Sequence, residues 1–92
     1  MILVTSSDQR YKIVAIPDQG WYFYSPPINN PDRELFISTD DPLAFQVAEM
    51  LNIKVERATR SHLAAKILLQ KLINLEKVKI NKGRRHELTA LI

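Results

Sequence analysis

The chain has no cysteine, only two glycines and no long apolar run. Without thiols it can form neither a disulfide framework nor a zinc site built on thiolates, and it has no thiol nucleophile. Two glycines leave no Gly-rich loop to hold a phosphate. No apolar stretch approaches the roughly 18 residues of a membrane span, and the opening residues lack the basic start and apolar core of a secretory signal. The sequence therefore predicts a soluble, cytoplasmic protein.

The composition that remains is that of an ordinary globular domain. Of the 92 residues, 46% are hydrophobic and 25% are charged, which is typical of a chain that folds. A chain of this length corresponds to one domain with a thin core. We therefore expect a single folded domain over residues 1–92.

The net charge of +3 conceals an uneven distribution. Residues 1–50 contain three basic and seven acidic side chains, whereas residues 51–92 contain ten basic and three acidic ones. A basic half often marks an anionic partner, most often nucleic acid. The alternative is that the two halves pack together and neutralise each other, or that the lysines only keep a helix soluble. Both interpretations stay open from the sequence alone.

Two β-rich segments predict an antiparallel hairpin or meander in the N-terminal third. Residues 2–5 form a short run with β-branched side chains, and residues 11–16 form a second segment that Pro17 ends. The sequence PDQG at 17–20 has the chemistry of a turn. The aromatic residues 21–24 are then expected to return as the next strand.

The aromatic segment presents different residues on its two faces. In a strand, Trp21 and Phe23 point one way while Tyr22 and Tyr24 point the other. We expect one pair to lie in the core. The other pair is then exposed, and exposed tyrosines stack on nucleic-acid bases or anchor protein interfaces.

The middle of the chain contains the clearest helix signal. Residues 34–39 are strand-like, and Asp41 before Pro42 is a natural N-cap followed by proline at the first helical position. Apolar residues then recur at helical spacing up to residue 51, and Asn52 fits a left-handed C-cap. These signals predict a strand at 34–39 and a helix at 42–51.

Two interpretations compete for the residues after this helix. In the favoured one, residues 53–57 form a strand, so that strand 34–39, helix 42–51 and strand 53–57 make a right-handed βαβ crossover. Thr59 or Ser61 then caps a long helix over residues 61–77. The predicted class is α+β, with an N-terminal meander, a βαβ-like middle and a long C-terminal helix.

In the alternative, residues 42–76 form a helix-turn-helix, and residues 79–92 form a basic wing. The pattern resembles the helix-turn-helix of bacterial response-regulator output domains, through Val47, Ala48, Leu51, Ile53, His62 and Leu63. The resemblance covers only part of the chain, and Asn52 stands where that family usually has glycine. It implies that Lys54, Arg57, Arg60 and Ser61 face a DNA groove or its phosphates.

No residue pattern supports catalysis or a cofactor. His62 has no acid or second histidine at i±3 or i±4, which a metal site on a helix requires, and His86 beside two arginines suits anion binding. Asp40 and Asp41 follow a strand and could hold Mg²⁺, but a helix cap is the more common use of such a pair. We therefore predict a protein that is not an enzyme and needs no metal or cofactor.

The sequence predicts a small binding or regulatory module whose basic half contacts an anionic partner, with nucleic acid favoured. The alternative is a protein-interaction adaptor, or a small subunit of a complex, that uses the apolar helix 61–77, which could also form a homodimer. The residues expected to contact nucleic acid are Lys54, Arg57, Arg60, Lys66, Lys82, Arg84 and Arg85. Those of the helix surface are Leu63, Ile67 and Ile73.

Overall fold

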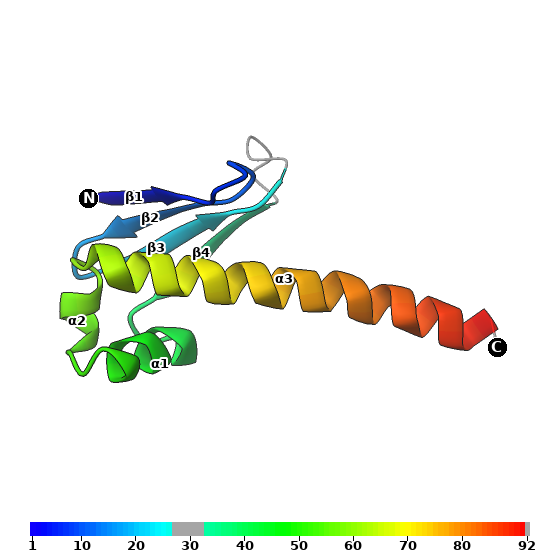
Figure 1. Ribbon diagram of the computed structural model, residues 1–92. Coiled ribbons are helices and arrows are strands. Elements are labelled where there is room, and N and C mark those ends of the chain that lie inside the picture. The colour runs from blue at the N-terminus through cyan, green and yellow to red at the C-terminus, as the bar shows by residue number, and fades with distance from the viewer. Residues whose placement is uncertain (27–32, 92) are drawn as a thin grey trace.

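The computed structural model describes the backbone of residues 1–26 and 33–91 and the side chains of residues 1–26 and 33–76. Four strands come first in the chain and the helices follow (Figure 1). This arrangement confirms the predicted α+β class. Within the described part of the chain, none of the helices is both long enough and apolar enough to cross a lipid bilayer.

The strands form one antiparallel sheet in the order β1-β2-β3-β4, so neighbours in the chain are neighbours in the sheet. The N-terminal meander and the strand at 34–39 are therefore confirmed. The strand bounds are β1 Ile2–Thr5, β2 Lys12–Ile16, β3 Gly20–Tyr24 and β4 Glu34–Ser38.

The predicted turn at Pro17 joins β2 to β3. The Gln19 N–H donates a hydrogen bond to the Ile16 carbonyl at 3.0 Å, and Asp18 has a φ of 64°, as a type II turn requires at its third position. Gly20 follows with a φ of 147°, and a Cβ there would collide with the Ile37 carbonyl oxygen of β4. Glycine is thus required for β3 and β4 to approach at this point.

Helix α1 (Pro42–Met50) matches the prediction closely. Asp41 Oδ1 accepts a hydrogen bond from the Leu43 N–H at 2.9 Å, which confirms the N-cap. Asn52 has a φ of 55°, so the predicted left-handed residue lies just after the helix. The carboxylate of Asp41 is therefore used in capping.

The strand predicted at 53–57 is wrong, and so is the βαβ crossover that depended on it. Residues Val55–Ala58 form the one-turn helix α2, and all neighbouring strands are antiparallel. Val55, Ala58 and Thr59 are buried while Glu56 and Arg57 are exposed, which is the i, i+3, i+4 spacing of a helix. A strand would have placed Val55 and Arg57 on the same face.

The helix-turn-helix interpretation is also wrong. Helix α2 has only four residues, too few to serve as a recognition helix. Helix α3 (His62–Leu91) starts separately and continues through the residues expected to form a hairpin-like wing at 79–92. Ser61 Oγ accepts from the Ala64 N–H at 3.1 Å, so of the two predicted caps Ser61 is the one that caps this helix.

The core lies between one face of the sheet and the helices. Trp21 and Phe23 are buried there with Ile13 and Ile37. Helix α3 contacts both the sheet and α1, and Figure 1 shows it running across the sheet with α1 on its other side. This explains the wide apolar arc of α3, because α3 is buried on two sides within the same chain.

Candidate interaction surfaces

Three of the predicted basic residues lie at the corner where α2 leads into α3. Lys54, Arg57 and Arg60 are all exposed. In the single turn of α2, Val55 and Ala58 point into the core, and the charged residues between them, Glu56 and Arg57, face solvent. The residues line one open hollow, here called the corner hollow: Asp18, Asn52, Ile53, Lys54, Glu56, Arg57, Arg60 and Ser61.

One wall of the corner hollow is the β2–β3 turn, which is fixed by two contacts. Arg60 Nη2 lies 2.8 Å from Asp18 Oδ2, and the Asp18 N–H donates to Thr59 Oγ1 at 2.8 Å. The hydrogen bond and the charge of Asp18 together raise the pKa of the Arg60 guanidinium above its ordinary value. Both side chains of the pair are more than half exposed, so the pair adds little stability.

The ion pairs between the two halves of the chain are few. Among residues 1–26 and 33–76, Arg60 is the one basic side chain of the second half with a carboxylate of the first half within 4.0 Å. The other inter-half pair joins Arg33 to Glu76, and it uses a basic residue of the first half. Most of the basic side chains described after residue 50 thus face solvent without an ion pair to the acidic half.

The remaining predicted basic residues lie away from the corner. Lys66 is exposed on α3 and borders a separate hollow beside the β1–β2 turn, with Asp8 on its rim. Lys82, Arg84 and Arg85 fall in the part of α3 that runs beyond the sheet (Figure 1), and their side chains lie outside the described residues. The structure therefore divides the predicted basic set into a corner cluster, an isolated lysine and a helical extension.

The predicted apolar surface on α3 is not continuous. Leu63 is 56% exposed, but Ile73 is only 6% exposed and belongs to the core. Ile67 is partly buried and packs against the same core. The prediction that Ile73 lies on an exposed surface is therefore wrong, because this side chain points from α3 into the core of its own domain.

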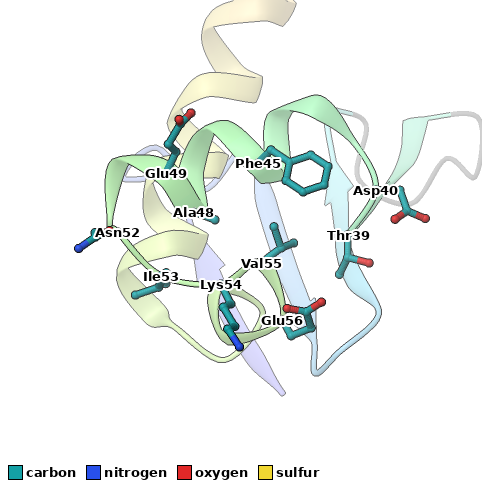
Figure 2. A pocket seen from close by; sticks show the side chains of 10 residues that line it. All are labelled: Thr39, Asp40, Phe45, Ala48, Glu49, Asn52, Ile53, Lys54, Val55 and Glu56. Atoms are coloured by element: carbon teal, nitrogen blue, oxygen red, sulfur yellow. The ribbon is translucent and has the colours of Figure 1, made fainter.

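A third hollow lies beside the corner hollow and includes the carboxylates of Asp40, Glu49 and Glu56. It has a volume of about 720 Å³ and is open to solvent. In Figure 2, Phe45 and Val55 point toward its middle, and Lys54, Glu56 and Asp40 line its border. Among the residues whose side chains are described, no group of three His, Cys, Asp or Glu side chains is placed to hold a metal ion.

The open face of the sheet was only partly predicted. Tyr22 and Tyr24 lie on this face, opposite the buried pair Trp21 and Phe23, as strand alternation requires. The strand register adds neighbours that the sequence did not identify, because it aligns residues from all four strands. One row across the sheet consists of Leu3, Val14, Tyr22 and Phe36.

The next row on the open face has polar residues on both sides of its tyrosine. It consists of Thr5, Lys12, Tyr24 and Glu34. The Tyr24 hydroxyl donates to Glu34 Oε1 at 3.3 Å, and Lys12 Nζ lies 4.7 Å from the centre of the Tyr24 ring. Partial burial and the Glu34 carboxylate together raise the pKa of Tyr24.

Comparison with known proteins identified no relative of this chain. No family model, no curated protein and no solved structure matches this chain.

Proposed function

We propose that this chain is a non-enzymatic binding module that contacts an anionic partner, nucleic acid, through the basic side chains of its C-terminal half. The observation that supports the proposal is the low number of ion pairs between the halves. If the two halves served only to neutralise each other, the basic side chains after residue 50 would meet carboxylates of the first half. Among the described side chains, Arg60 alone does so.

The corner hollow supplies the first set of contacts. Lys54 and Arg57 line it and are exposed, and Arg60 pairs there with Asp18. Arginine offers several N–H donors in a planar group that suits phosphate oxygens. Asp18 and Glu56 in the same hollow oppose an anion, so the corner by itself is a modest site.

The extension of α3 supplies the second set. Residues 77–91 contain five basic side chains and one acidic one, and the helix there runs beyond the sheet (Figure 1). A basic helical segment clear of its domain can follow a phosphate backbone. Lys82, Arg84 and Arg85 belong to this segment and contribute to the proposed binding surface.

The test is a salt titration of binding to labelled DNA and RNA, followed by fluorescence anisotropy. A substitution that removes one basic side chain from a phosphate reduces the slope of log affinity against log salt by about 1. We expect Lys54→Ala/Arg57→Ala and Arg84→Ala/Arg85→Ala each to weaken binding and to flatten this slope. The matched control is Arg10→Ala/Arg33→Ala, which removes the same charge from exposed positions of the acidic half.

Two results would contradict the proposal. One is the absence of binding at low salt for the unmodified chain. The other is an equal weakening in the Arg10→Ala/Arg33→Ala control, which would show that affinity follows total charge alone.

A further inference from the structure

The open face of the sheet exposes apolar side chains across its whole width. Leu3 on β1 is 58% exposed and Phe36 on β4 is 42% exposed, with Val14 and Tyr22 between them. The helices pack on the opposite face, where Ile13, Trp21 and Ile37 are buried, and none of the described elements covers the open face (Figure 1). Contiguous apolar side chains on a surface of this kind mark an interaction site.

The aromatic rings on this face are already ordered by contacts with one another. The Tyr22 and Phe36 ring centres are 4.8 Å apart, and the Tyr22 and Tyr24 ring centres are 6.5 Å apart. Phe36 also extends over Gly20, where a Cβ would approach its ring tip at 3.0 Å. The glycine thus lets Phe36 lie close to the sheet, beside the Tyr22 ring.

We propose that a second copy of this chain packs face to face on the open sheet, related by a twofold axis that runs along β3. Such an axis exchanges the positions of β2 and β4 between the copies. It places Lys12 opposite the partner's Glu34, and Val14 opposite the partner's Phe36. Tyr22 meets the partner's Tyr22 on the axis.

The charges on the face favour a second copy over nucleic acid. Lys12 and Glu34 occupy the same row on either side of Tyr24, so the face has one charge of each sign along that row. A twofold axis along β3 converts this arrangement into two opposite-charge pairs. Phosphates would meet the carboxylate as well as the amine, and the face offers no excess of basic side chains to hold them.

The size of the face fits a weak dimer. Because the axis exchanges β2 with β4, the strands that overlap the partner are β2, β3 and β4. At about 4.8 Å apart and five residues each, they give a flat area of roughly 250 Å², below the 800 Å² or so that each partner buries in a standard stable interface. Two sheets that pack with their strands roughly aligned form an ordinary sandwich. We therefore expect a dimer that dissociates on dilution.

The test is sedimentation equilibrium of the full chain over a range of protein concentrations. We expect Lys12→Glu and Glu34→Lys each to weaken dimerisation at least about tenfold, because each creates two like-charge contacts across the axis. The double variant Lys12→Glu/Glu34→Lys restores opposite charges and should recover much of the affinity. Lys66→Glu makes the same charge change on α3 and should leave dimerisation unchanged.

A separate variant addresses the apolar row. Phe36→Ser should abolish dimerisation, whereas Leu63→Ser, on the exposed side of α3, should leave it intact. Fluorescence of Trp21, which is fully buried on the other face, reports whether each variant remains folded. A monomer at every soluble concentration would overturn the proposal, and so would failure of the double charge swap to recover dimerisation. A dimer abolished by Leu63→Ser but kept in Phe36→Ser would assign the interface to α3 and also overturn it.

Discussion

The Asp18 backbone N–H donates a hydrogen bond of 2.8 Å to Thr59 Oγ1, which lies 41 residues later in the chain. The Thr59 hydroxyl in turn donates to the Glu56 carbonyl at 2.6 Å. One buried hydroxyl thus satisfies a donor of the β2–β3 turn and an acceptor of α2. It joins the sheet to the helices at the corner hollow.

The first prediction concerns this hydroxyl. Thr59→Val keeps the shape of the side chain but leaves the Asp18 N–H and the Glu56 carbonyl without their partner. We expect a loss of about 1–3 kcal/mol in the free energy of unfolding, measured by urea denaturation followed by Trp21 fluorescence. Thr5→Val makes the same change at an exposed position on β1 and should alter stability by less than about 0.5 kcal/mol. Equal unfolding midpoints for the two variants would refute the bridging role of Thr59.

The second prediction concerns the cap of α1. Asp41→Ala removes the acceptor of the Leu43 N–H and should cost about 1 kcal/mol. Asp41→Ser retains an acceptor and should recover most of that loss. Asp40→Ala removes the neighbouring exposed carboxylate, whose side chain makes no capping bond in the described structure, and should be nearly neutral. If Asp40→Ala and Asp41→Ala lower the thermal midpoint equally, local charge explains the effect better than capping.

The third prediction concerns Gly20. Gly20→Ala places a methyl group against the Ile37 carbonyl and requires a φ of 147° that L side chains rarely adopt. We expect a loss of more than about 2 kcal/mol, because strain and steric overlap add together. The contrasting variant is Gly83→Ala, within the helical backbone of α3, where alanine favours the helix by about 1 kcal/mol. In chemical denaturation, Gly20→Ala should lower the unfolding midpoint and Gly83→Ala should not. An unchanged midpoint in Gly20→Ala would contradict the predicted collision.

The fourth prediction concerns the β1–β2 turn. Ser6 Oγ donates to Asp8 Oδ1 at 2.6 Å and the Arg10 N–H donates to the same oxygen at 3.1 Å. These bonds, the Ser6 bond above all, hold the pKa of the Asp8 carboxyl below its ordinary value. A lowered folded pKa gives stability that is present above the unfolded pKa and is lost as the pH falls through the folded pKa.

The variant that tests this relationship is Ser6→Ala. It should raise the pKa of Asp8 toward its ordinary value, as followed by NMR titration of the carboxyl carbon. Ser7→Ala removes a neighbouring exposed hydroxyl and serves as the control. An Asp8 titration that responds equally to both substitutions would show that Ser6 is not the main cause of the shift.

The sequence was sufficient where the structure depends on local chemistry. The Asp41 cap, the Pro17 turn and the two faces of β3 each follow from a few adjacent residues. The prediction of a strand after α1 is wrong because Ile53 and Val55 alternate with polar residues as they would in a strand, although Val55–Ala58 is helical. A helix of a single turn shows only one repeat of the helical period, which is too short a pattern to identify. Burial of Ala58 and Thr59 against the rest of the domain therefore decides between a strand and a helix.

The candidate surfaces needed the tertiary structure. The pairing of Asp18 with Arg60 spans 42 residues and depends on where the β2–β3 turn meets α2. The row that joins Leu3 to Phe36 depends on the register of three strand pairs. The sequence predicts an exposed Ile73 because it does not show that α1 and the sheet cover α3 from two sides.

The strict β1-β2-β3-β4 order has a consequence for the rate of folding. Each strand pairs with a strand adjacent in the chain, so the sheet closes only short loops and loses little chain entropy at each step. The packing of α3 on β1 closes a long loop of the chain, because it brings the last helix to the first strand. Topologies dominated by local pairings fold fast. We therefore expect substitutions in the β2–β3 turn to slow folding, and substitutions between α3 and β1 mainly to accelerate unfolding.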